Sequence, residues 1–197
     1  DPAIPPFGFV IDYLTYGGLY REVWLEATAE SRLTDLFVYT PTLQEAVVQW
    51  TAELTPAAAA VRIRLENADG ALLAEQTAPV AETGKMQLSV PEAQPWDTEH
   101  PVLHHAIAEL LNAAGQPIDR KQVTFGFRTA EFRADGFYLN GKKTFLRGLN
   151  RHQSYPYIGY AAPESLQRED ARILQEELHC TAVRTSHYPQ SQYFLDE

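Results

Sequence analysis

The sequence has 197 residues, of which 45% are apolar and 11% aromatic, a globular composition that excludes a disordered chain. Acidic residues outnumber basic ones 26 to 16 and no basic stripe appears, which excludes a surface built for nucleic acid or for an anionic membrane. No run reaches the ~18–20 apolar residues of a membrane span, and the single cysteine, Cys180, excludes an internal disulfide.

The two ends of the chain are typical of a segment of a longer protein. The first residues, DPAIPPFGFV, lack an initiator Met and the basic region of a signal peptide, and the last, QSQYFLDE, enter a helix. We therefore expect a fragment. For its parent protein we expect a soluble, cytoplasmic location in preference to a periplasmic or secreted one.

The first zone, residues 1–29, opens as a loop and is expected to turn into a strand. We expect a strand with one buried face from Tyr20 to Trp24, whose two aromatic residues lie an even number of positions apart.

The second zone, residues 30–130, is a series of short strands separated by turn signals. Its clearest strand is the one in which Val61, Ile63 and Leu65 alternate with charged residues. Strands at roughly ten-residue spacing over about 100 residues predict an immunoglobulin-like β-sandwich. The candidates are Leu33–Thr40, Ala46–Leu54, Ala60–Asn67, Leu72–Thr77, Gly84–Val90, Val102–Asn112 and Ile118–Arg128.

The third zone, residues 131–197, changes pattern at the dipeptide Asn140-Gly141, which predicts a type I′ hairpin between Phe137–Leu139 and Lys143–Leu146. A strand at Phe145–Leu149, a helix over 163–178, a strand at Thr181–Thr185 and a helix from Ser191 follow. This order predicts a parallel βαβ unit. The zone is far shorter than the ~250 residues of a (β/α)8 barrel, so we expect only its first βαβ portion. The fold class is therefore mainly β: an immunoglobulin-like sandwich followed by the start of a truncated barrel.

The helix over 163–178 is expected to begin with Pro163 in its first position and to bury one stripe of side chains. Only Asp170 breaks the apolar character of that stripe, whose members are Leu166, Asp170, Ile173, Leu174 and Leu178.

Polar side chains follow both strands of the βαβ unit, at the edge where ligands bind in parallel α/β folds. Adjacent parallel strands lie ~4.8 Å apart, so we expect His152 and His187 to line one pocket that suits a polyol such as a sugar. Arg184 lies in an apolar strand, where a buried guanidinium requires a carboxylate partner. Each histidine taken alone is more often structural, and a zinc site lacks a third ligand.

Two further features have a structural reading and a functional one. Alternation turns one of His104 and His105 to solvent, and we interpret both as structural. Trp96 is interpreted as a loop aromatic that plugs the sandwich, with a carbohydrate platform as the alternative.

Four motifs in succession resemble glycoside hydrolase family 2. The end of the family's N-terminal jelly roll is similar to DYLTYGGLYREV (12–23), and its linking sandwich is similar to WDTEHPVL (96–103) with FGFR (125–128). The segment that opens its barrel is similar to FYLNGKKTFLRGLNRHQ (137–153), and its second barrel strand is similar to TAVRTSHYP (181–189). The resemblance covers the whole chain. It implies that residues 1–29 are the tail of a sugar-binding jelly roll, 30–130 the sandwich and 131–197 the incomplete TIM barrel.

The resemblance implies a retaining exo-β-glycosidase in which one glutamate is the acid/base and another the nucleophile, their carboxyls ~5 Å apart. Both glutamates are expected beyond Glu197, so we expect this fragment to be inactive. The motifs favour β-galactosidases, with terminal β-D-galactosides as substrates. The alternatives are a β-glucuronidase, a β-mannosidase, or a non-catalytic sandwich module that binds carbohydrate or another domain.

The family's site residues carry over onto matching positions of this sequence. The resemblance implies that His152 and His187 bind sugar hydroxyls and stabilise the transition state, that Arg184 steadies the nucleophile, and that Asn150 and Arg151 shape the pocket wall. It also places Asp12 in the sugar pocket, where in some β-galactosidases the residue helps hold a sodium ion. Gln153 departs from the glutamate often found there.

The resemblance also implies cofactors and partners. No cofactor is expected within the fragment, whereas the full-length enzyme is expected to use magnesium and sodium. A β-galactoside-type sugar is the expected substrate, and the full-length enzyme is expected to be a homo-oligomer that binds neither nucleic acid nor membrane.

Overall fold

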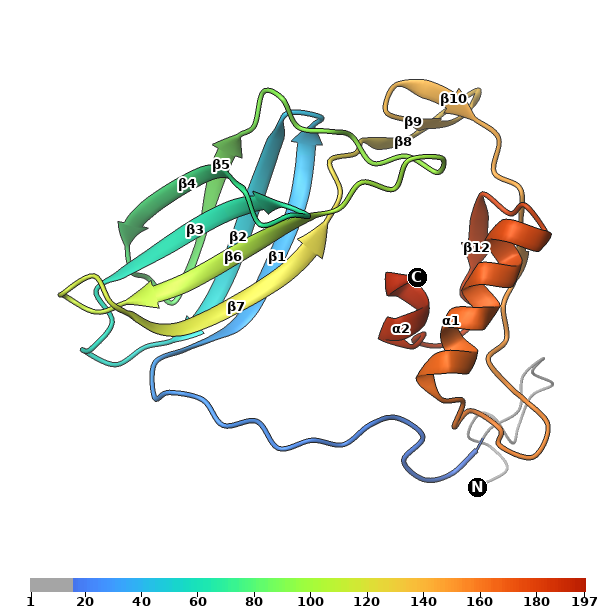
Figure 1. Cartoon of the computed structure of the whole chain (residues 1–197), viewed down its shortest axis with the longest axis horizontal. Coiled ribbons are helices and arrows are strands. Elements are labelled where there is room, and N and C mark those ends of the chain that lie inside the picture. Colours follow the sequence, from blue (N-terminus) through green and yellow to red (C-terminus); the bar gives the residue numbers. More distant parts are fainter. Residues whose placement is uncertain (1–15) are drawn as a thin grey trace. The chain divides into compact units, whose positions relative to one another are not determined.

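A computed structural model describes residues 16–197 of the chain. The described residues form two compact units (Figure 1). One unit contains residues 26–144, and the other contains residues 16–25 together with 145–197. The hairpin of the third zone therefore groups with the sandwich, and the division falls after Thr144.

The first unit is a sandwich of two antiparallel sheets, as predicted (Figure 1). One sheet has the order β1-β2-β5 and the other the order β4-β3-β6-β7. All seven predicted strands are present, with ends that differ by a few residues. Their bounds are β1 Arg32–Thr42, β2 Glu45–Glu53, β3 Ala60–Asn67, β4 Leu72–Pro79, β5 Thr83–Ser89, β6 His104–Leu111 and β7 Pro117–Phe125.

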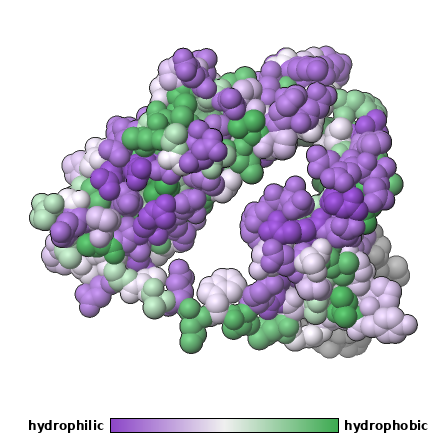
Figure 2. All heavy atoms as spheres, viewed as in Figure 1, coloured by the Kyte–Doolittle hydropathy of each residue, from purple (hydrophilic) through white to green (hydrophobic). Residues whose placement is uncertain are grey.

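The sandwich core follows the alternation of its strands. Val61, Ile63 and Leu65 of β3 are fully buried, and the charged residues between them are half-buried. Trp50 of β2 and Phe127 belong to the same buried cluster. Hydrophilic side chains predominate over the face of this unit in Figure 2, with apolar ones scattered among them, as expected for sheets with one buried face.

Short elements follow β7 in the first unit. Strands β8 (Ala130–Arg133), β9 (Gly136–Leu139) and β10 (Lys142–Thr144) form a small antiparallel sheet. Asn140 and Gly141 connect β9 to β10 with φ of 52° and 75°, which confirms the predicted hairpin. Trp96 is half-buried, and its Cβ and ring lie beside Gly126. The Arg128 guanidinium lies 4.7 Å from the centroid of the Trp96 ring. These contacts favour the structural interpretation of Trp96.

The predicted strand from Tyr20 to Trp24 is wrong. Residues 16–29 contain no strand, and the side chains of Val23 and Trp24 are about three-quarters exposed, at 75% and 74%. Tyr20 and Trp24 would lie on one face of a strand, but a strand also needs a neighbour for its backbone groups, and no described residue forms such a ladder with this segment.

The second unit contains the predicted βαβ element. Strands β11 (Gly148–Asn150) and β12 (Ala182–Arg184) pair in parallel, and α1 (Glu164–Arg172) with the π-helical turn η1 (Ile173–Glu177) connects them. Helix α2 (Gln192–Asp196) follows. The parallel pair is close, because a Cβ at Gly148 would lie 1.9 Å from the Ala182 carbonyl oxygen. Only glycine fits there.

Two details of α1 differ from the expectation. Pro163 is the N-cap, and the first helical residue is Glu164. The buried side chain of α1 is Gln167, whereas Leu178, which ends the predicted stripe, is exposed.

Candidate functional site

The ends of β11 and β12 bring two histidines together, as the parallel pairing predicts. Asn150 lies opposite Arg184 in the register, and the Arg151 N–H donates to the Arg184 carbonyl at 2.9 Å, one step beyond the strands. The rings of His152 and His187 follow with centroids 5.9 Å apart and planes at 80°. Both side chains are exposed, so their ring nitrogens can reach a ligand.

Tyr188 and Ser186 surround His152. The Tyr188 hydroxyl lies 3.4 Å from His152 Nδ1, and the buried Ser186 hydroxyl lies 3.5 Å from Nε2. These distances are long for hydrogen bonds of oxygen and nitrogen. The Tyr188 hydroxyl is itself fixed, because it accepts the Gln153 N–H at 3.0 Å.

A cluster of tyrosines supports this edge from the side of residues 16–25. Buried Tyr160 is its centre, with ring centroids 5.0 Å from Tyr188, 4.8 Å from Tyr16 and 5.7 Å from Tyr20. The Tyr16 hydroxyl also lies 3.0 Å from that of Ser154. Edge-on and tilted aromatic pairs at these distances are favourable, so the segment is packed directly against the loop that follows His152.

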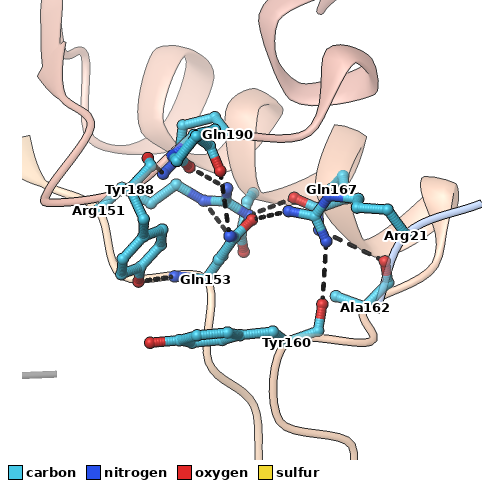
Figure 3. Close-up of polar contacts among 10 residues, drawn as sticks. Arg21, Arg151, Gln153, Tyr160, Ala162, Gln167, Tyr188 and Gln190 are labelled. Atoms are coloured by element: carbon cyan, nitrogen blue, oxygen red, sulfur yellow. Dashed lines mark hydrogen bonds and ion pairs between the residues drawn. The ribbon is translucent and has the colours of Figure 1, made fainter. Parts of the chain in front are cut away.

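Arg21 and Gln153 form the polar part of the same contact (Figure 3). Arg21 donates from Nη1 to the Tyr160 carbonyl at 3.1 Å and from Nη2 to Gln153 Oε1. Gln153 is fully buried, and its amide donates to the Pro189 carbonyl at 3.4 Å. A neutral glutamine at this position therefore uses its carbonyl oxygen to accept from Arg21 and its amide to hold the His187 loop.

Arg151 was expected in the pocket wall, and the structure places its guanidinium in the interior of the unit (Figure 3). Its side chain is 4% exposed and forms an ion pair with Asp170 at 2.7 Å. Gln167 and Gln190 accept from the two terminal nitrogens at 2.8 and 2.6 Å. Asp170, the one polar residue of the predicted apolar stripe, is thus the partner of a buried cation.

Arg184 was expected to be buried, and Asn150 was expected in the pocket wall. Both are exposed, and neither side chain has a hydrogen-bond or ion-pair partner among residues 16–197. The guanidinium of Arg184 is exposed, so the cost of burying it unpaired does not arise among the described residues. Asp12 lies outside the described residues.

One titratable group beside the site is strongly perturbed. Burial and the nearby Asp170 carboxylate raise the pKa of Tyr155 to about 12. The Tyr155 hydroxyl is buried and has no hydrogen-bond partner of good geometry within the described chain. Tyr155 is therefore protonated throughout the physiological range and has no acid–base role here.

Other sites are not evident in the described part of the chain. Residues 16–197 contain no cluster of three or more His, Cys, Asp and Glu side chains that could hold a metal ion. No helix among them is long and apolar enough to cross a membrane. A hollow on the outer face of β1, β2 and β5 contains neither a histidine nor a pair of carboxylates, so the strand ends remain the candidate site.

Sequence reasoning missed the residues that support the site, namely Tyr16, Tyr160, Arg21, Gln167 and Asp170. Asp170 carried a usable signal, since a lone carboxylate in an apolar helical stripe requires a cation. The others gave none, because their partners are far away in the sequence.

Comparison with known proteins gives matches over both units. The model of glycosyl hydrolases family 2 matches residues 31–128, and the model of the TIM barrel domain of the same family matches residues 130–197.

Individual relatives agree with these family matches. A β-galactosidase of Thermoanaerobacter pseudethanolicus is 38% identical over 98% of this chain and 27% of its own length. A putative β-glucuronidase of Formosa agariphila is 33% identical over 96% of this chain and 24% of its own. The crystal structure of a Bacteroides uniformis β-glucuronidase matches 98% of this chain and 25% of its own with a TM-score of 0.82 and 28% identity. The chain thus spans about a quarter of the length of these relatives.

Proposed function

Because the chain belongs to glycosyl hydrolase family 2, we propose that it is part of a retaining exo-β-glycosidase that hydrolyses terminal β-D-galactosides. The β-galactosidase relatives at 37–38% identity support galactosides. The observation that carries the proposal is the pair of exposed imidazoles 5.9 Å apart at the carboxyl ends of two parallel strands, the position of active sites in TIM barrels.

The two imidazoles would bind the sugar, and they would not contact the two catalytic glutamates that break the glycosidic bond. Each offers a ring nitrogen as a hydrogen-bond donor toward a sugar hydroxyl, and these bonds would strengthen as charge develops on the ring in the oxocarbenium-like transition state. In a retaining reaction one glutamate attacks the anomeric carbon while the other protonates the leaving oxygen, and water then cleaves the glycosyl-enzyme. We assign neither catalytic glutamate to these 197 residues, because no glutamate lies directly at the carboxyl end of β11 or β12.

The other expected site residues receive separate roles. Exposed Arg184, with its guanidinium unpaired within residues 16–197, would pair with the nucleophilic carboxylate. Exposed Asn150 would line the pocket, and buried Arg151 would support the pocket without contacting the sugar. We derive no step through magnesium or sodium, since the described residues hold no fitting cluster and Asp12 lies outside them.

A β-glucuronidase is the second candidate. The exposed guanidinium of Arg184 would also suit the carboxylate of a uronic acid, and solved structures of β-glucuronidases resemble this chain at 25–28% identity. The third candidate, a β-mannosidase, has no comparable observation in its favour.

The test uses the complete protein that contains this sequence and nitrophenyl β-galactoside, β-glucuronide and β-mannoside as substrates. We expect the galactoside to be hydrolysed with the highest kcat/KM and with retention of the anomer, followed by NMR. His187→Ala should lower kcat on the order of 10²–10³-fold, as for loss of one transition-state hydrogen-bond donor. His100→Ala, at an exposed histidine of the sandwich, is the matched control. A near wild-type kcat for His187→Ala would refute the role of that histidine.

We also propose that the complete protein is a homo-oligomer and that it works in the cytoplasm. Light scattering after size exclusion and cell fractionation test the two points directly, and a monomer or a periplasmic pool would contradict them.

A further inference from the structure

We propose that Arg151 is a positioning residue that holds His152 and His187 in one geometry, an inference that rests on the proposed function. Arg151 lies in the chain between the end of β11 and His152. Its side chain is turned into the unit and is 4% exposed. It therefore cannot contact a sugar itself, and any influence on the site must pass through neighbouring residues.

Every nitrogen of the Arg151 guanidinium has an acceptor. Nε and Nη2 both donate to Asp170 Oδ2, at 2.9 and 2.7 Å, and Nη2 also donates to Gln167 Oε1 at 2.8 Å. Nη1 donates to Gln190 Oε1 at 2.6 Å. The guanidinium of an arginine is planar and holds several donors in fixed directions, so it restricts the arginine backbone more than the ammonium of a lysine would. The contacts with α1 therefore fix the position of Arg151, which directly precedes His152.

The same guanidinium also fixes the loop that carries His187. Gln190, three residues further on, accepts from Arg151 and donates to the Tyr188 carbonyl at 3.2 Å. The Phe194 ring of α2 lies under the guanidinium at 4.1 Å, a cation–π contact. The two histidine-bearing loops thus share one buried cation.

The consequence for catalysis is geometric. A displacement of about 1 Å at a reacting group can cost on the order of 10²-fold in rate. If Arg151 is lost, the backbone on both sides of the histidine pair loses its common anchor, and we expect kcat to fall more than KM rises. A residue that only stabilised the fold would leave kcat of the folded enzyme unchanged.

The experiment compares Arg151→Ala with Arg172→Ala in the complete protein, below the unfolding temperature of each variant. Arg172 is the matched control, because it is an arginine of α1, the helix that carries Asp170, and it forms ion pairs only with exposed glutamates. We expect kcat to fall about 10²-fold in Arg151→Ala and to stay within about twofold in Arg172→Ala. Millimolar guanidinium should restore part of the lost kcat in Arg151→Ala, and methylammonium, which lacks the fork, should not.

A folded Arg151→Ala enzyme with wild-type kcat and KM overturns the proposal, as does an equal response to both cations. If Arg151→Ala does not fold, Gln190→Leu releases only the His187 loop, and an unchanged kcat for that variant overturns the proposal equally.

The crystal structure of Arg151→Ala, or of Gln190→Leu, separates this inference from the proposed function. Its distance between the His152 and His187 ring centroids, 5.9 Å in the parent chain, needs no substrate. An unchanged distance refutes positioning. An inactive wild-type protein refutes the glycosidase assignment and leaves the distance test intact.

Discussion

Replacement of Asp170 by Asn tests whether the Arg151 cation depends on one carboxylate. The substitution keeps the shape of the side chain and removes the negative charge that faces the Arg151 guanidinium, whose side chain is 4% exposed. Breaking a buried ion pair from one side costs about 3–5 kcal/mol. Asp170 is 25% exposed and two glutamine oxygens still accept from Arg151, so we expect the lower part of that range, about 3 kcal/mol.

The assay for Asp170→Asn is amide hydrogen exchange of peptides from α1, because local opening can be measured in a protein of several domains. About 3 kcal/mol corresponds to roughly 150-fold faster exchange wherever exchange occurs by opening of this unit. Peptides from β3 serve as the internal control and should be unchanged, since β3 belongs to the other compact unit.

The outcome that would refute this reasoning is unchanged exchange in α1 of Asp170→Asn. The double variant Arg151→Met with Asp170→Leu gives a second check, because replacing both members of a buried pair by apolar residues is often nearly neutral. We expect the double variant to exchange more slowly than Asp170→Asn. If it exchanges faster, the cost lies in packing and not in the unpaired charge.

Two further predictions concern the sandwich. A Cβ at Gly84 would lie 2.1 Å from the Trp50 ring, so Gly84→Ala should lower the free energy of unfolding by about 1–3 kcal/mol and change the Trp fluorescence. Gly17→Ala is the control and should change neither quantity, because a Cβ at Gly17 would have no atom within 4 Å. Burial lowers the pKa of His104 below 6.5, so the unfolded state binds the proton more readily and stability is lost as pH falls through 6.5 and below. The unfolding midpoint of His104→Phe should fall less between pH 7.5 and pH 5.5 than that of the parent or of His105→Phe, and equal falls would contradict the assignment.

Local patterns in the sequence were enough to predict the elements whose structure depends on neighbours along the chain. Alternation at Val61, Ile63 and Leu65 located a central strand of the sandwich, since burial of one face gives a period of two residues. The pair Asn140-Gly141 located the hairpin, since both residues adopt positive φ there. The parallel pairing of β11 with β12 followed from the order of strand, helix and strand.

Patterns failed where a residue's environment is set by distant partners. Tyr20 and Trp24 would share one face of a strand, yet Glu22 interrupts that face and the segment has no strand beside it among the described residues. Gln167 is buried because its side-chain oxygen accepts from the Arg151 guanidinium, a contact that the apolar stripe of the helix does not indicate. No local pattern shows that Arg151 faces α1 instead of the pocket.

The histidine pair is the part of the candidate site that this chain can build from its own contacts. The register of β11 and β12 sets the two chain ends side by side, and Arg151 ties both following loops to α1 and α2. Tyr160 and Gln153 add the contact with residues 16–25. These interactions are all internal to one compact unit, so the imidazoles are oriented before any carboxylate from elsewhere approaches them. A catalytic group that is already in place costs no reorganisation when the transition state forms, which is the physical reason to expect the greater effect of Arg151 on kcat than on KM.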